Sequence, residues 1–239
     1  MPNRTMPPTA IFVHGAGGGG WEWTIWQRVF AAHGCNALAP DLRPSSAGLV
    51  ATRFADYAAQ VREWCAGTAA PCALIGASLG GLLALEVAAV TECAALVVIN
   101  PLPPGSSRES TTDRSIVPWG RDRSLSGTRR ALPDGDDAAS LFAFRRWRDE
   151  SAAVLRDAAS MTVPAALADS TIRDRRRSIL VVASERDEDC PPAASRALAE
   201  RLGADFRLIP GASHVGPLLG RGAALAAEDT WRWLHERVR

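Results

Sequence analysis

The chain has 239 residues, a formal net charge of +1, 47% hydrophobic and 22% charged residues, a composition that excludes the intrinsically disordered and fibrous classes. The balanced charge predicts no nucleic-acid partner, because proteins of that class carry a strongly basic surface. All 27 basic residues are arginine, which excludes chemistry that needs a lysine amine, such as a Schiff base or a Walker-type phosphate site.

Short apolar runs that end at turn residues predict strands at 11–13, 35–39, 72–75 and 94–99, with helices between them at 21–32, 54–65 and 79–90. The last of these helices is apolar nearly all round, which is typical of a buried helix. After residue 100 the rhythm stops. Residues 105–137 are rich in Ser, Arg and Gly, and only short helices are expected, at 141–148 and 152–159. The alternation of strands and helices then resumes, with strands predicted at 178–183 and 206–209 and helices at 193–202 and 223–238.

Six strands separated by helices predict an α/β fold with a mostly parallel sheet of about six strands and helices on both faces. The interruption divides the chain into a first core part, 1–100, an inserted cap, 101–177, and a second core part, 178–239. Because crossover connections are right-handed, the loops that follow the strands meet at one edge of the sheet, where such folds bind ligands.

The five cysteines are scattered and form no CxxC pair, so neither a metal site nor a disulfide framework is expected. Residues 1–10 are polar and proline-rich, unlike a secretory signal. The most apolar stretch, 72–100, contains Glu86 and Glu92 and reads as strand, helix and strand rather than as a membrane span. We therefore expect a cytoplasmic protein without a membrane partner.

Gly76-Ala77-Ser78-Leu79-Gly80 fits the pattern G-x-S-x-G between a predicted strand and a predicted helix. A sharp reversal of the chain there needs almost no side chain two positions before and after Ser78. It would expose the Ser78 hydroxyl and leave the Leu79 N–H free to bind an oxyanion. The alternative is a glycine-rich turn in which Ser78 only caps a helix.

The loop 14–20 after the first strand, His-Gly-Ala-Gly-Gly-Gly-Gly, has three interpretations. It can supply the second half of an oxyanion hole through the Ala16 N–H. It also fits the dinucleotide fingerprint G-x-G-x-x-G, with Asp41 at the distance of a ribose-binding acid. Three tryptophans that follow would crowd a pyrophosphate, and no Tyr-x-x-x-Lys pair exists, which favours the oxyanion loop. A loop without a role is the third interpretation.

A general base and its orienting acid are expected on the last two strand loops. Of four histidines, His214 lies just after the last strand, among small residues that would let its ring reach across the crevice. Asp187 follows the preceding strand and is the candidate that holds His214 in the tautomer with a basic Nε2, with Asp189 as the alternative. Ser78, Asp187 and His214 then follow in the chain order of α/β-hydrolases.

These motifs, with Trp21-Glu22-Trp23 and Gly211-Ala212-Ser213-His214, resemble the α/β-hydrolase superfamily over almost the whole chain. The similarity is greatest to the plant-type methylesterase and hydroxynitrile lyase branch and its bacterial relatives. The resemblance implies a serine nucleophile, oxyanion donors at Ala16 and Leu79, and a cap inserted after Asn100. Two departures are visible: the usual N-terminal strand pair is missing, and no lysine accompanies His214, which disfavours cyanohydrin cleavage.

The expected function is hydrolysis of a small-molecule carboxylic ester or thioester through an acyl-enzyme, with no metal or organic cofactor. One alternative keeps the site for non-hydrolytic chemistry, such as C–C cleavage or cyclisation in a biosynthetic pathway. Another is a small-molecule receptor on a hydrolase scaffold. An anionic substrate or an acyl-carrier partner could use the arginines of the cap, although an arginine-biased solvated surface is the simpler interpretation: Arg108, Arg114, Arg121, Arg123, Arg129, Arg130, Arg145, Arg146 and Arg148.

Overall fold

The computed structural model describes residues 8–69, 71–105, 114–169 and 178–238. Three parts of the sequence analysis therefore lie outside the described residues: positions 1–7 of the N-terminal segment, the cap residue Arg108, and residues 170–177 at the end of the predicted cap. The predicted cap can be followed over 101–105 and 114–169.

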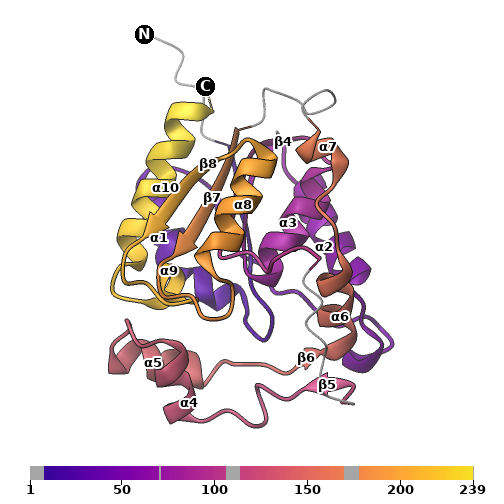
Figure 1. Ribbon diagram of the computed structural model, residues 1–239, viewed down its shortest axis with the longest axis vertical. Coiled ribbons are helices and arrows are strands. Elements are labelled where there is room, and N and C mark those ends of the chain that lie inside the picture. Colours follow the sequence, from indigo (N-terminus) through magenta and orange to yellow (C-terminus); the bar gives the residue numbers. More distant parts are fainter. Residues whose placement is uncertain (1–7, 70, 106–113, 170–177, 239) are drawn as a thin grey trace.

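A six-stranded parallel sheet forms the centre of the molecule, as predicted (Figure 1). Its spatial order is β2-β1-β3-β4-β7-β8, and each neighbouring pair is parallel. The connection after β1 leads to β2 on one side of β1, and the connection after β2 leads to β3 on the other side. The carboxyl ends of β1 and β3 therefore flank a crevice of the kind that binds ligands in open α/β sheets. The strands are β1 (Ala10–Val13), β2 (Ala37–Leu38), β3 (Cys72–Ala77), β4 (Cys93–Ile99), β7 (Ser178–Ser184) and β8 (Asp205–Ile209).

Helices cover both faces because alternate strand residues point to opposite sides. Ile11 and Val13 of β1 pack with one buried cluster, whereas Ala10 and Phe12 pack with another. The first cluster is covered by α2 (Phe54–Ala66), α3 (Leu79–Ala88) and α8 (Pro192–Leu202). The second is covered by the short helix η1 (Gly20–Trp23), α1 (Thr24–Ala32), α9 (Gly216–Leu219) and α10 (Ala223–Arg237).

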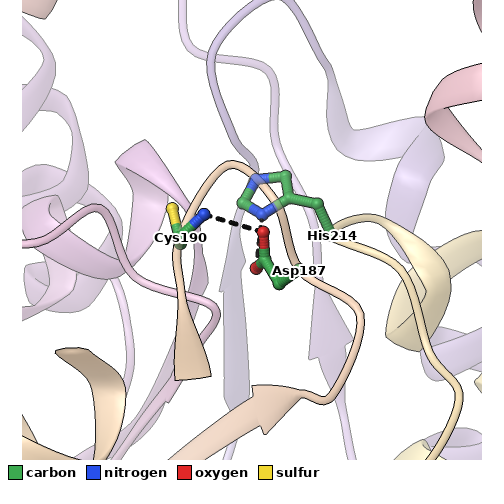
Figure 2. Close-up of side chains that lie close together, drawn as sticks. All are labelled: Asp187, Cys190 and His214. Carbon is green, nitrogen blue, oxygen red and sulfur yellow. Dashed lines mark hydrogen bonds and ion pairs between the residues drawn. The ribbon is translucent and has the colours of Figure 1, made fainter. Parts of the chain in front are cut away.

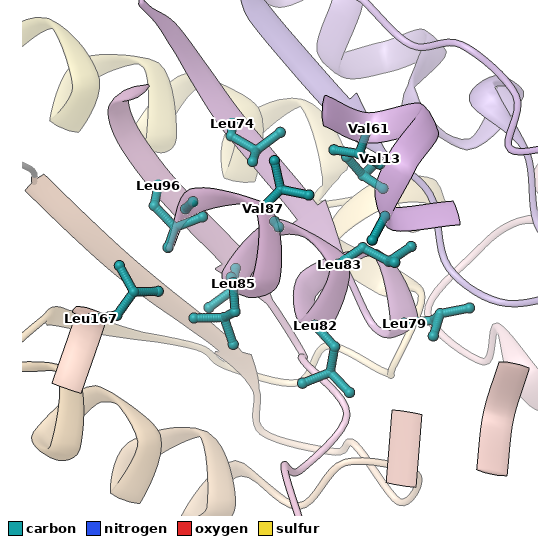
Figure 3. Packing of buried hydrophobic residues seen from close by; sticks show 14 of the residues in the cluster. Val13, Val61, Leu74, Leu79, Leu82, Leu83, Leu85, Val87, Leu96 and Leu167 are labelled. Carbon is teal, nitrogen blue, oxygen red and sulfur yellow. The ribbon is translucent and has the colours of Figure 1, made fainter. Parts of the chain in front are cut away.

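Helix α3 lies inside the first cluster, and its leucines contact strand residues such as Leu74 and Leu96 (Figure 3). Nine of its ten residues are buried, as its all-apolar sequence predicts. Among the helices that the structure describes, none is long and apolar enough to cross a membrane. The carboxyl end of β3 is thus held between its neighbouring strands β1 and β4 and helix α3.

Tryptophans fill the second cluster below the Gly-rich loop. The Trp23 ring stacks on Phe12 at 4.9 Å, and the Trp26 indole donates to the Pro217 carbonyl at 2.8 Å. Both tryptophans are fully buried. The helix that follows the Gly-rich loop is therefore anchored in the core through its tryptophans.

The segment between β4 and β7 falls into two parts. Its first part lies beyond the carboxyl ends of the strands (Figure 1). That part contains α4 (Leu125–Ala131), α5 (Asp137–Phe144) and the antiparallel strands β5 (Ile116–Val117) and β6 (Glu150–Ser151), a pair that the sequence did not predict. Its second part, α6 (Ala152–Ser160) and α7 (Ala165–Ala168), packs into the first core cluster through Val154, Ala158 and Leu167. Only the first part is therefore placed to cover a site at the sheet edge.

Candidate active site

Ser78 stands at a strained turn between β3 and α3. Its backbone has φ 53° and ψ −120°, and it and Asn100 are the only non-glycine residues with positive φ in the described part of the chain. A Cβ on Gly76 would lie 2.1 Å from the Gly80 carbonyl oxygen, and a Cβ on Gly80 would lie 2.2 Å from the Val13 carbonyl oxygen. The glycines therefore allow β1, β3 and α3 to meet. Strain of this kind persists only where the surrounding packing imposes it.

The Gly-rich loop after β1 lies against Ser78, since a Cβ on Gly15 would be 3.2 Å from Ser78 Cβ. Three of its backbone N–H groups donate hydrogen bonds within the protein. Gly18 N–H donates to Gly15 O, Gly20 N–H to the Asp41 carboxylate, and Gly17 N–H to the Glu150 carboxylate. Among the described residues, the N–H groups of Ala16 and Leu79 donate no hydrogen bond. Both predicted oxyanion donors are thus unpaired next to the turn at Ser78.

Residues 148–150 of the predicted cap hold this loop in place. The Arg148 N–H donates to Gly17 O at 2.8 Å, and its Nε donates to Gly18 O at 2.6 Å. The buried Glu150 carboxylate accepts from Gly17 N–H at 3.2 Å and from the Tyr57 hydroxyl at 3.0 Å. The geometry of the Gly-rich loop therefore depends on the cap as well as on the core.

Two further arginines of the cap form ion pairs near the surface. Arg121 contacts Asp149 at 2.6 Å and Arg129 contacts Asp137 at 2.9 Å. These contacts offset part of the basic charge that an acyl-carrier partner would need. No contact of the described arginines singles out such a partner.

His214 and Asp187 meet at the same edge of the sheet (Figure 2). Asp187 lies on the loop after β7, its side chain is fully buried, and its Oδ2 accepts from His214 Nδ1 at 2.8 Å. Its Oδ1 accepts from the backbone N–H groups of Asp189 and Cys190 at 2.9 and 2.7 Å. Asp189, the alternative acid, thus contributes a backbone donor that orients Asp187.

The pairing determines the protonation of His214. Burial lowers its pKa, but hydrogen bonds to Asp187 and to the Cys190 thiol outweigh burial and raise the pKa to about 10. With Nδ1–H committed to Asp187, the unprotonated ring presents a basic Nε2. Within the described residues, Ser78 Oγ and His214 form no hydrogen bond. Catalytic contacts of this type are often loose until a substrate is bound.

Two polar contacts that the sequence did not reveal fix the His214 loop. The Asn100 amide donates to Ser184 Oγ at 2.8 Å and to the His214 carbonyl at 2.7 Å. Asp134 of the cap accepts from Ser213 Oγ at 2.5 Å and from Ser213 N–H at 3.1 Å. The position of Asn100, directly after an apolar strand and at the sheet edge, was a usable signal, whereas nothing in the local sequence marks Asp134.

His14 supports the loop as a neutral residue. Its Nδ1–H donates to Gly15 O at 2.8 Å, because Nε2 faces two donors, Leu42 N–H at 2.9 Å and the Arg148 guanidinium at 3.1 Å. Complete burial lowers the pKa of His14 to about 4. His14 therefore braces the loop without carrying charge.

Glu22 is a buried carboxyl group beneath the Gly-rich loop. It is 4% exposed, its carboxyl group would contact a Cβ on Gly18, and its Oε2 has no hydrogen-bond partner among the described residues. Burial raises the pKa of Glu22 to about 7, although N–H groups of Gly19 and Gly15 and the charges of His214 and Arg148 oppose this. The sequence pattern assigns Glu22 no role, because a charged residue in the first turn of a helix is normally solvated.

Replacing Glu22 with glutamine is expected to stabilise the fold increasingly as the pH rises. The folded protein binds the Glu22 proton more tightly than the unfolded chain does, so this contribution is full below about pH 4.5 and is lost as the pH rises through about 7. The difference in unfolding free energy between E22Q and the parent protein should grow by about 3 kcal/mol over that interval.

Urea unfolding of both proteins at a series of pH values measures this difference. The exposed Glu63 offers the matched control, and E63Q should show no comparable trend. The two pKa values of Glu22 set a test interval of roughly pH 4 to 8. If the difference in unfolding free energy between E22Q and the parent protein stays constant over that interval, the assignment of a raised pKa to Glu22 is wrong.

The sequence model of the Alpha/beta hydrolase family matches residues 10–228. No curated protein sequence matches the chain. The matched range contains the Gly-rich loop, Ser78, Asp187 and His214.

Solved structures with the same fold include several esterases. A thermophilic esterase from Thermogutta terrifontis has a TM-score of 0.76 and 17% identity, covering 97% of this chain and 91% of its own. A methylesterase from Arabidopsis has a TM-score of 0.75 and 15% identity, covering 96% and 99%. Tomato methylketone synthase I, solved with 2-tridecanone, has a TM-score of 0.74 and 16% identity, covering 98% and 100%. At these identities the likeness concerns the fold.

Proposed function

Because the chain belongs to the α/β-hydrolase family, we propose that it is a serine hydrolase that cleaves a small-molecule carboxylic ester or thioester. The observation that carries this proposal is the strained Ser78, with φ 53°, at the same sheet edge as the hydrogen-bonded pair of His214 and Asp187. A serine that only caps a helix would need no such backbone, and Ser78 makes no capping hydrogen bond with its side chain.

In the first half of the reaction, Ser78 Oγ attacks the acyl carbonyl carbon while its proton passes to His214 Nε2. The negative charge that develops on the carbonyl oxygen is bound by the N–H groups of Ala16 and Leu79. The buried Asp187 carboxylate stabilises the imidazolium and prevents the ring from turning. The imidazolium then protonates the leaving alcohol or thiol, which departs and leaves an acyl group on Ser78.

In the second half, a water molecule replaces the leaving group. His214 takes a proton from the water, whose oxygen attacks the acyl carbonyl, and then returns that proton to Ser78 as the acid departs. The same two N–H groups bind the second oxyanion. Apart from the substrate and this water molecule, the proposed reaction uses only side chains and backbone N–H groups of the chain.

Two other functions keep the same residues and differ in outcome. Non-hydrolytic chemistry would use Ser78 and His214 on a substrate that has no hydrolysable ester. A receptor would bind a small molecule without turnover. A tomato methylketone synthase shares the fold, but 16% identity does not transfer its reaction to this chain.

A fluorophosphonate probe tests the nucleophile directly. We expect one adduct per chain, mapped to Ser78, and none in S78A. Only unprotonated His214 can accept the Ser78 proton, so labelling should accelerate as the pH rises towards the His214 pKa of about 10. Hydrolysis of p-nitrophenyl esters of increasing acyl length then reports turnover. Labelling without turnover of any ester favours the receptor or the non-hydrolytic function, and no labelling refutes the serine nucleophile.

A further inference from the structure

The thiol of Cys190 lies beside the pair of His214 and Asp187, and the proposed reaction does not use it (Figure 2). One ligating atom from each of Asp187, Cys190 and His214 lies within 4.8 Å of the other two. Of the described residues, these are the only three His, Cys, Asp or Glu side chains that converge in this way. Because the donors come from two loops, no spacing in the sequence indicates them.

The local backbone holds these three donors in place. Cys190 is buried, and its N–H donates to Asp187 Oδ1 at 2.7 Å. That bond and the one from Asp189 N–H satisfy Oδ1, so Oδ2 remains on the side of the imidazole and the thiol. The Asn100 amide fixes the His214 carbonyl from behind. The cluster is therefore built by the fold and does not depend on mobile surface side chains.

The combination of thiolate, imidazole and carboxylate suits a borderline divalent cation such as Zn²⁺, which binds them at about 2.0 to 2.3 Å. Ligand atoms around tetrahedral Zn²⁺ are roughly 3.2 to 3.7 Å apart at those bond lengths. His214 Nδ1 and Asp187 Oδ2, now 2.8 Å apart, need to separate slightly, and the Cys190 Sγ, which lies within 4.8 Å of the donor atoms of both residues, needs to move closer to them. Mg²⁺ and Ca²⁺ prefer oxygen ligands alone.

We propose that Asp187, Cys190 and His214 form a binding site for Zn²⁺ or a similar borderline cation, and that its occupation inhibits the enzyme. The cation takes the lone pair of Nδ1, the single proton of the neutral ring moves from Nδ1 to Nε2 by exchange with solvent, and the proton of the Cys190 thiol is released to solvent. A neutral imidazole whose Nδ1 binds a metal carries its proton on Nε2. That nitrogen can no longer accept the Ser78 proton, and Asp187 no longer orients the ring. The inhibition rests on the proposed function, whereas the binding does not.

Titration of the full chain with Co²⁺ tests the binding, because a thiolate bound to Co²⁺ absorbs in the near ultraviolet. We expect the band to saturate at one Co²⁺ per chain and to be displaced by Zn²⁺. It should vanish in C190S and C190A, with at least about tenfold weaker affinity. It should persist in C65S, which removes a thiol from the separate contact of Cys65 with Cys72. Circular dichroism and thermal unfolding confirm that each variant is folded.

The second part of the proposal, that the bound cation inhibits the enzyme, is tested by measuring ester hydrolysis at increasing Zn²⁺ concentration. The Zn²⁺ concentration for half inhibition should rise at least about tenfold in C190S, measured against its own metal-free rate. S78A, which has no nucleophile, should keep the Co²⁺ band, so a failure of the proposed function is distinguished from a failure of the metal site. Absence of the band in the parent protein, or its survival in both Cys190 variants, overturns the site. A bound cation with undiminished hydrolysis overturns the inhibition.

Discussion

Replacing His214 with alanine is expected to lower kcat for an ester substrate by about 10⁴- to 10⁶-fold while the protein remains folded. The ring lies on a loop held by the Asn100 amide through a backbone carbonyl, so its removal does not disconnect the loop. S78A should lose as much activity as H214A, and the double variant S78A/H214A should lose no more than either. Groups that act as a unit in proton transfer show this lack of additivity.

Steady-state hydrolysis of p-nitrophenyl esters and the fluorophosphonate labelling rate measure this loss. The exposed His235, which stacks on Trp231 at 5.9 Å, is the matched control, and H235A should hydrolyse at the parental rate. If the losses in S78A and H214A multiply in the double variant, the two side chains act in separate steps and the proposed proton transfer is wrong.

The substitution D187N tests how Asp187 controls the tautomer and the pKa of His214. Its amide can turn a donor toward Nδ1 and so stabilise the tautomer with the proton on Nε2, which removes the base without emptying the pocket. The same change removes a negative charge that raises the His214 pKa. The lower pKa leaves more of the ring unprotonated at neutral pH, but a ring with its proton on Nε2 cannot accept the Ser78 proton. D187N labelling by the fluorophosphonate should therefore fall although Ser78 is intact.

The sheet was predictable because burial on both faces requires continuous apolar runs. Residues 94–99 and 178–183 read as strands for this reason, and both are central strands in the structure. The strand predicted at 35–39 shortens to Ala37–Leu38, because it lies at the sheet edge and pairs only with β1. The order of strands and helices along the chain also predicted which loops meet at one edge of the sheet, and therefore where the candidate site lies.

Contacts between distant segments were not predictable from local pattern. Strands β5 and β6 have two residues each and pair across more than thirty intervening positions, so neither has a periodicity of its own. Glu150 and Arg148 read as ordinary charged residues, yet they hold the Gly-rich loop that carries Ala16. The sequence located the groups proposed to react, because strand ends and glycines mark them. It did not locate the groups that position them.

Replacing Gly80 with alanine is expected to destabilise the fold by about 3 to 5 kcal/mol. Its Cβ would lie 2.2 Å from the Val13 carbonyl oxygen and 2.6 Å from the His14 carbonyl oxygen, and both acceptors belong to backbone that cannot rotate away. The clash can be relieved only if α3 moves away from β1. Gly222 has open space around its Cα and an ordinary negative φ, so G222A should change stability by no more than about 0.5 kcal/mol.

The same substitution connects the stability of the turn with its chemistry. Moving α3 away from β1 carries the Leu79 N–H and Ser78 Oγ away from Gly15 and Ala16, so G80A should label slowly even at temperatures where it is folded. Urea unfolding and the labelling rate, measured on the same samples, report the two effects. If G80A were destabilised but labelled at the parental rate, the close approach of α3 and the Gly-rich loop would serve folding alone, and the strain at Ser78 would need another explanation.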